Sequence, residues 1–167
     1  MSLLHQLSSV VAPWAAFYSD SKAAESVVTF GHLGGMMTAG GFALASDRAT
    51  LRASRPGAAV EPAWQLAELS GVHPIVVGAL GVTAMSGLLM FAADLETLAV
   101  SPAFWIKMGL VGLLLLNGWI MLRTERALRA GAVADHLGWR RMRRAAMGSL
   151  ALWFAVVLAG SILPNVS

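Results

Sequence analysis

The feature that most constrains this chain is a long apolar run, Pro102 to Leu122, that contains a single charge. The run reads PAFWIKMGLVGLLLLNGWIML, and Lys107 is its only charged residue. At about 1.5 Å of rise per residue, a helix of this length extends roughly 30 Å, the thickness of the hydrocarbon core of a bilayer. The run therefore predicts a transmembrane helix.

Three further apolar runs have a similar length, at residues 27–45, 72–93 and 145–163. The whole chain is 57% apolar and 13% charged, with a mean hydropathy of +0.67, which suits a protein whose surroundings are mostly lipid. We predict an all-α polytopic membrane protein, in which residues 1–167 form a single membrane domain. Its spans, about 27–45, 72–93, 102–122 and 145–163, are expected to form an antiparallel four-helix transmembrane bundle.

Residues 1–22 lack the basic region and the cleavage motif of a secretory signal. Their apolar side chains recur at helical spacing, which predicts an amphipathic helix lying in the membrane interface, with Trp14 and Tyr18 at headgroup level. A poorly ordered terminus is the alternative. Residues 46–70 are predicted to form a loop, broken by prolines, with a short interfacial helix over residues 62–70.

The arginines predict the topology, because they all lie in two of the connections between spans, residues 46–70 and 123–144. Four spans place these connections on one side, which the positive-inside rule makes cytoplasmic. The connection that carries Asp94 and Glu96 then lies outside, as do both termini, in a bacterial inner membrane.

Arginines in such short loops do not indicate a nucleic-acid partner. The absence of cysteine excludes disulfides, thiolate metal sites and iron–sulfur clusters.

Two ionisable residues, His32 and Lys107, lie at similar depth within the spans, on the extracytoplasmic side. A charge at the bilayer centre costs about 2.5–3.5 kcal/mol on insertion scales, so such residues face the interior of the bundle or extend to the interface. Lys107 has two interpretations. It extends toward Asp94 or Glu96 as a structural pair, or it holds an anionic ligand group such as a carboxylate, a heme propionate or a quinone oxygen.

His32 has four interpretations: an axial heme ligand, a metal ligand, a proton carrier, or a hydrogen-bonded packing residue. Gly31 and Gly35 form a small-xxx-small step beside it, which allows another helix or a flat ligand to approach closely. Ligation of one heme by His32 and His73 together is not expected, because their depths differ by about 20 Å. His73 is predicted to be an interface residue.

Methionines offer a second ligand chemistry. Met36 lies one turn from His32 on the same helix face, and Met90 and Met108 lie in the outer half of their spans. Thioether and imidazole groups together suit Cu(I), although methionine is also an ordinary filler of apolar cores. Asn117 is expected to form a hydrogen bond between helices. The chain contains no Walker loop, dinucleotide fingerprint, HExxH motif or nucleophile triad.

The pattern GLLMFAADLETLAVSPAFWIKMGLVGLLLLNGWIMLR, followed by an arginine-rich loop and RRAAMGSLALWFAVVLAGSILP, resembles the copper-resistance D (CopD)-like membrane domain. The first span, FGHLGGMMTAGG, resembles the histidine-then-glycine first helix of several small membrane families. Among them is the bacterial membrane-bound protoporphyrinogen oxidase, which pairs a first-helix histidine with a lysine of a later helix and binds heme b. The resemblance covers most of residues 27–163. It implies a functional role for His32 and Lys107. The chain has SDRATLR in place of the oxidase's arginine and histidine signature, and fewer spans than the full copper-resistance protein.

Three functional hypotheses follow. The first is a heme- or copper-associated membrane protein with a ligand site in the outer leaflet, between the first and third spans. There His32 is the ligand and Lys107 the anion partner, with Met36, Met90 and Met108 as further copper ligands. The second is a non-catalytic accessory subunit of a larger respiratory or photosynthetic membrane complex, or a homo-oligomer. The third is an oxidoreductase acting on a quinone or a porphyrin, so the sequence leaves enzymatic activity open.

Overall fold

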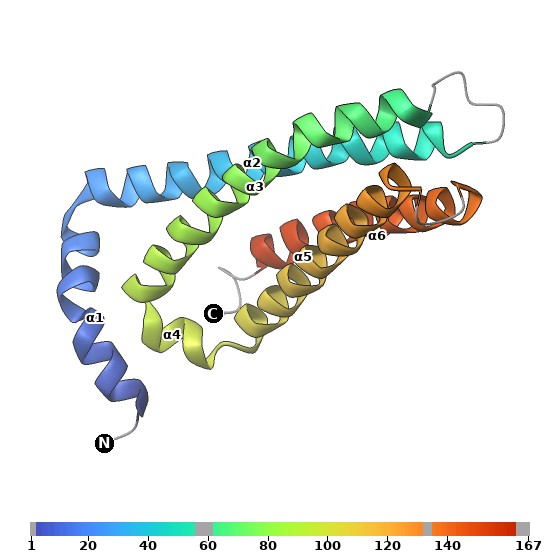
Figure 1. Cartoon of the computed structure of the whole chain (residues 1–167). Coiled ribbons are helices and arrows are strands. Elements are labelled where there is room, and N and C mark those ends of the chain that lie inside the picture. Colours follow the sequence, from blue (N-terminus) through green and yellow to red (C-terminus); the bar gives the residue numbers. More distant parts are fainter. Residues whose placement is uncertain (1–2, 56–61, 132–134, 163–167) are drawn as a thin grey trace.

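The computed structural model describes residues 3–55, 62–131 and 135–162, and within these ranges every regular element is a helix (Figure 1). The helices are α1 (Leu3–Asp20), α2 (Lys22–Ala53), α3 (Pro62–Ala93), α4 (Leu95–Val100), α5 (Pro102–Arg129) and α6 (Asp135–Ile162). Four of them, α2, α3, α5 and α6, are long and apolar enough to cross a membrane. The predicted all-α polytopic fold is confirmed.

The long helices extend further than the apolar runs that predicted them. α2 continues to Ala53 and α3 begins at Pro62, so most of the predicted loop at residues 46–70 is helical. Residues 62–70 are the first turns of α3 and do not form a separate interfacial helix. The physical reason is that a helix needs no apolar residues beyond the membrane, only the absence of a breaker. Proline costs little at a first helical position, and Pro62 occupies that position in α3.

Capping residues mark both ends of α5. The Ser101 hydroxyl accepts a hydrogen bond from the Phe104 backbone N–H at 3.4 Å, and Pro102 occupies the first helical position. Arg129 is the last helical residue, and Gly131 follows with a φ of 63°, the left-handed conformation that often ends a helix. The helix therefore extends well past the predicted span at residues 102–122.

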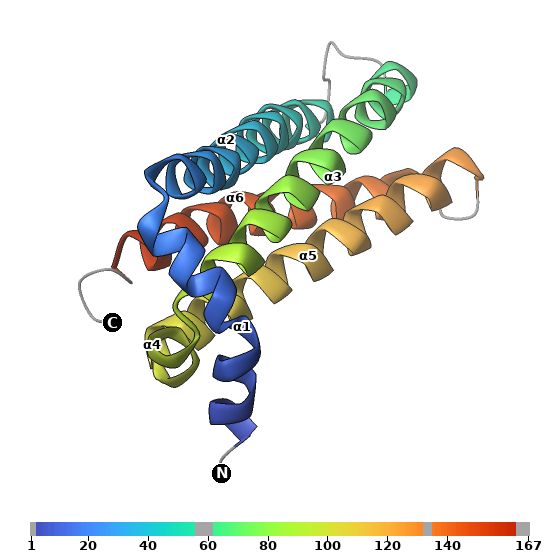
Figure 2. The same cartoon turned by 90° about the vertical axis from the view of Figure 1, so that its left-hand side faces the viewer.

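The four long helices pack as two antiparallel hairpins, α2–α3 and α5–α6, which meet through α2 and α6 (Figure 2). One core cluster lies midway along the helices, around Ala39, Leu114, Trp153 and Val156. Asn117 donates a hydrogen bond to the Ala145 carbonyl oxygen at 2.9 Å, so the predicted contact between helices is confirmed. A second core cluster lies where the arginines gather and consists of Leu69, Met121, Leu128, Met142 and Ala145.

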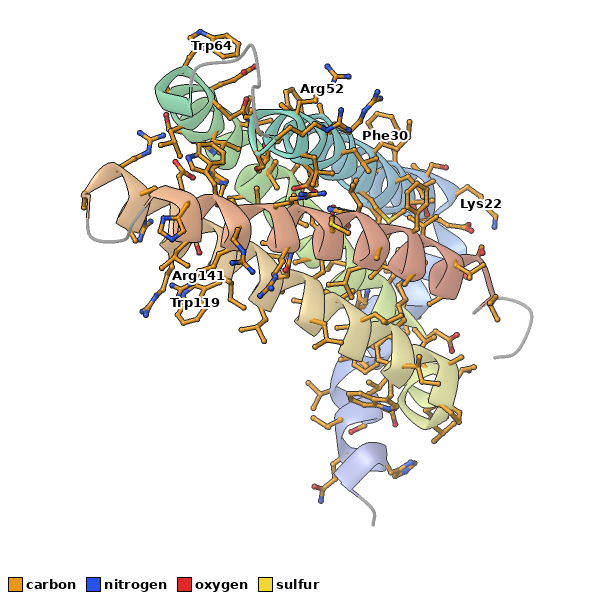
Figure 3. The ribbon with its side chains drawn as sticks, turned by 90° about the vertical axis from the view of Figure 1, so that its right-hand side faces the viewer. Lys22, Phe30, Arg52, Trp64, Trp119 and Arg141 are labelled. Atoms are coloured by element: carbon orange, nitrogen blue, oxygen red, sulfur yellow. The ribbon has the colours of Figure 1, made fainter. Side chains whose placement is uncertain are left out.

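The two ends of the long helices differ in composition. We call the end formed by Ala53, Pro62, Arg129 and Asp135 the arginine end, and the opposite one the α4 end. In Figure 3, Lys22 and Trp64 lie at these opposite ends, and the Phe30 ring points away from the bundle. Phe30 is 78% exposed, as expected for a side chain that faces lipid.

The predicted N-terminal helix is present as α1, which turns away from α2 at Ser21 and lies across the α4 end (Figure 1). Its Trp14 indole N–H donates a hydrogen bond to the Leu89 carbonyl oxygen of α3 at 2.8 Å. The Trp14 ring also contacts Phe17 and Tyr18. Tryptophan and tyrosine side chains of this kind are typical of a helix that lies in a membrane interface.

Candidate functional site

His32 lies on the face of α2 that packs against α3. Its Nδ1 atom is 3.0 Å from the Thr83 carbonyl oxygen and 3.3 Å from the Ser86 hydroxyl oxygen. A carbonyl oxygen only accepts hydrogen bonds, so Nδ1 must carry the hydrogen in this contact. In the neutral imidazole the free lone pair is then on Nε2, the nitrogen that remains available to a ligand.

Glycines bring α3 close enough for this hydrogen bond. A Cβ atom added at Gly35 would lie 2.5 Å from the Thr83 hydroxyl oxygen and 2.8 Å from the Ala79 carbonyl oxygen. A Cβ atom added at Gly87 would lie 3.2 Å from His32 Cε1, so the ring packs directly over that glycine. The predicted close approach at Gly35 is therefore made by helix α3, and a flat ligand would have to approach His32 from another side.

Lys107 of α5 is half-buried and extends over α6. A Cβ atom added at Gly160 would lie 3.8 Å from Lys107 Cε and 3.9 Å from Nζ, so the absence of a side chain there makes room for the lysine. The ion pairs within the described ranges lie elsewhere, and Lys107 pairs with neither Asp94 nor Glu96. The structural pairing considered for Lys107 is therefore not formed.

The Lys107 ammonium is close enough to the His32 imidazole for the two groups to interact electrostatically. Both side chains are half-buried, and they come from helices that do not follow one another in the chain. The structure thus places the two predicted residues in one neighbourhood, in the part of the bundle nearer the α4 end. A cation beside a histidine can attract an anionic group but cannot share a metal ion with it.

The three methionines considered as copper ligands lie in different surroundings. Met36 packs against the middle core cluster. Met108 is 42% exposed and faces outward from α5. Met90 lines a groove of about 450 Å³ at the α4 end. Within the described ranges, no group of three or more histidine, aspartate or glutamate side chains is arranged to hold a metal ion.

A buried carboxylate at the arginine end was not predicted. Glu125 of α5 is 3% exposed, and its Oε2 atom is 3.1 Å from His73 Nδ1 of α3. Its Oε1 atom is 2.8 Å from the Arg129 guanidinium, which also donates a hydrogen bond to the Leu66 carbonyl oxygen. The sequence signal was available, because an acidic residue four positions before an arginine on a helix favours an ion pair. His73, predicted to be an interface residue, takes part in this link.

A second buried acid, Asp47, belongs to the segment predicted as a loop at residues 46–70. In the structure it lies inside α2 and is 2% exposed, and Thr50 beside it is fully buried. The spacing of Val28, Gly35 and Ala39, which are all buried, continues to Asp47. Extending that helical pattern past residue 45 would have placed this carboxyl on the packed face.

No protein-family model, curated protein or solved structure matches the chain. The site itself must therefore support any functional proposal.

Proposed function

We propose that this chain is a heme-binding integral membrane protein, with His32 as an axial ligand through Nε2. The observation that carries the proposal is the hydrogen bond between His32 Nδ1 and the Thr83 carbonyl oxygen. Metal-binding histidines commonly donate their other ring N–H to a carbonyl group, which fixes the tautomer and the ring orientation. The Ser86 hydroxyl, 3.3 Å from Nδ1, adds a second polar contact on that side.

Lys107 takes the role of anion partner in this proposal. A half-buried ammonium without a carboxylate partner in the described ranges favours a bound anionic group, and a heme propionate has the right charge. Heme b, when bound, would supply one-electron chemistry, so electron transfer is the corresponding role. The chain's own residues orient the ligand nitrogen, through Thr83, and hold a positive charge nearby.

Copper is a weaker alternative on the same histidine. A Cu(I) site would combine His32 with thioether groups. Met36, Met90 and Met108 lie in the core, in the groove and on the exposed surface, so a shared site would require large side-chain movements. The single oriented histidine therefore favours heme.

The resemblance to the CopD-like domain and to protoporphyrinogen oxidase supports the same proposal, because it attaches function to His32 and Lys107. We propose accordingly that the arginine end is cytoplasmic and that both termini lie outside a bacterial inner membrane. Activity on a quinone or a porphyrin would be an extension of heme binding.

A second candidate is an accessory subunit of a larger membrane complex, or a homo-oligomer. It is favoured by glycines on outward-facing parts of α3 and α5, at Gly78, Gly81, Gly109 and Gly112, where an added Cβ atom meets no other atom within 4 Å. Small residues at such positions allow another transmembrane helix to approach closely.

The visible spectrum tests the heme proposal. We would record oxidised and dithionite-reduced spectra of the detergent-purified protein, expressed with added heme, and of the His32→Ala variant. We expect a Soret band and a reduced α-band that His32→Ala loses. The matched control is His73→Ala, which removes a histidine held by Glu125 and should retain both bands.

A colourless wild-type protein would overturn the heme proposal. Copper content, measured on the same samples, would then decide for or against the copper alternative. Co-purification of further subunits with a colourless protein would favour the accessory-subunit candidate.

A further inference from the structure

A buried polar group between α2 and α6, separate from the proposed heme site, has no assigned role. Asp47 is 2% exposed and Thr50 is fully buried. Within the described ranges, Asp47 Oδ2 and Thr50 Oγ1 have no hydrogen-bond partner. Such orphaned atoms are unusual in a native interior, and each one calls for an explanation.

Both residues face the same helix. Positions three apart on a helix are neighbours on its surface, so Asp47 and Thr50 occupy adjacent places on one face of α2. From α6, Ser149 reaches this face, is 8% exposed and donates its hydroxyl hydrogen to the Asp47 carboxyl group. The interface therefore contains one carboxyl group with a single neutral donor and a second hydroxyl group close by.

No counter-charge compensates Asp47 within the described ranges. On α2, Arg48 and Arg52 are exposed and form no ion pair. On α6, Arg143 and Arg144 are exposed as well. The ionisable groups of α3 do not pair with Asp47 either, because Glu68 is exposed and His73 pairs with Glu125.

An isolated carboxylate in such a place is unfavourable. Moving a charge from water into a low-dielectric interior costs several kcal/mol or more unless it is paired, and a group that can bind a proton becomes neutral instead.

We propose that Asp47 is a proton-binding site within the membrane domain. The carboxyl group carries a proton in the folded protein and exchanges it with the aqueous phase at the arginine end. Ala53, where α2 ends, is six residues away, or roughly 9 Å along the helix. On binding, the proton forms an O–H bond with a carboxylate oxygen. On release, water or a buffer base accepts the proton.

The coordination chemistry favours a proton over a metal ion. Hard metal cations take about six or more oxygen ligands. The Asp47 site offers three side chains, and Ser149 uses its hydroxyl hydrogen toward the carboxyl group. A proton needs one acceptor oxygen, which this site supplies.

Infrared spectroscopy of the full-length protein tests the proposal. The carbonyl stretch of a protonated carboxylic acid is well separated from the stretches of a carboxylate. We expect this band at neutral pH in the wild type, its loss in Asp47→Asn and its retention in the control Glu68→Gln, which alters an exposed acid. Ser149→Ala should move the band to higher frequency, because the carbonyl group loses an accepted hydrogen bond.

Two results would overturn the proposal. One is a wild-type protein without the acid band at neutral pH. The other is a thermal midpoint that sodium chloride raises, relative to choline chloride, in the wild type but not in Asp47→Asn, since this would identify a metal cation. If Asp47→Asn does not fold, the spectrum of Ser149→Ala decides. An acid band at the same frequency as in the wild type would show that the protonated group is not Asp47. None of these readouts requires heme.

Discussion

At the scale of single residues, neighbouring glycines of the first membrane helix have different roles. Gly35 lies where any side chain would press on Thr83 and on the Ala79 carbonyl oxygen, whereas Gly34 has nothing within 4 Å of an added Cβ atom. The backbone approach at Gly35 also sets the distance between His32 and Thr83. Absence of a side chain at one position thus controls the orientation of the histidine.

Gly35→Ala should lower the free energy of unfolding by about 1–3 kcal/mol, the usual cost of overpacking an interior. The backbone carbonyl of Ala79 cannot move aside as a flexible side chain would. Thermal unfolding in detergent measures the change. Gly34→Ala is the matched control and should leave the midpoint unchanged, so equal destabilisation by both variants would contradict this account.

At the scale of elements, α3 and α5 are linked at the arginine end by side chains. The helix pairs whose backbones run closest are α2–α3, α5–α6 and α2–α6, and α3–α5 is not among them. Glu125 joins His73 of α3 to Arg129 of α5, and Arg129 also reaches the Leu66 carbonyl oxygen. A single buried carboxylate therefore holds the ends of two helices together.

Glu125→Ala should destabilise the protein by about 1–3 kcal/mol, because it removes the acid that pairs with His73 and leaves Arg129 without its ion-pair partner. Chemical or thermal unfolding in detergent provides the measurement. A double-mutant cycle with His73→Ala isolates the link between the helices. Strictly additive effects would show that His73 and Glu125 are not coupled.

At the scale of the whole molecule, arginines are confined to one end of the four long helices. Arg123 also covers the Trp119 ring, 4.1 Å from its centroid, and in Figure 3 Trp119 and Arg141 both lie in the half of the view that holds the arginine end. Arginine and tryptophan together are typical of a membrane interface. This asymmetry is the basis for the proposed orientation.

The orientation can be tested with single cysteines, because the natural chain has none. Glu96→Cys lies in α4, and Ala130→Cys follows α5 at the arginine end. A membrane-impermeant thiol reagent should label Glu96→Cys in intact bacterial spheroplasts and Ala130→Cys only after permeabilisation. The reverse pattern would invert the topology, and the unsubstituted chain controls for background labelling.

The existence of the four spans could be predicted because a long apolar run has few alternatives to a membrane helix. Their ends could not, since a helix that leaves the membrane continues with polar residues, as α2 does through Asp47 to Ala53. His32 and Lys107 were identifiable as ionisable groups in apolar surroundings. The partners of His32 were not, because the contact with Thr83 depends on which turn of α3 meets α2.

The attachment of α1 has a mechanical consequence for anything bound at His32. α1 leads directly into α2 at Ser21 and is held to α3 by the Trp14–Leu89 hydrogen bond. With α1 at the membrane surface, as the sequence predicts, this attachment would fix the depth of the bundle on that side. His32 lies eleven residues beyond Ser21, or roughly 16 Å along the helix. In membranes of different thickness, the distance of His32 from the surface on the α1 side would then stay constant. Any difference between the length of the apolar helices and the thickness of the bilayer would fall at the arginine end, where long arginine side chains can extend to the headgroups.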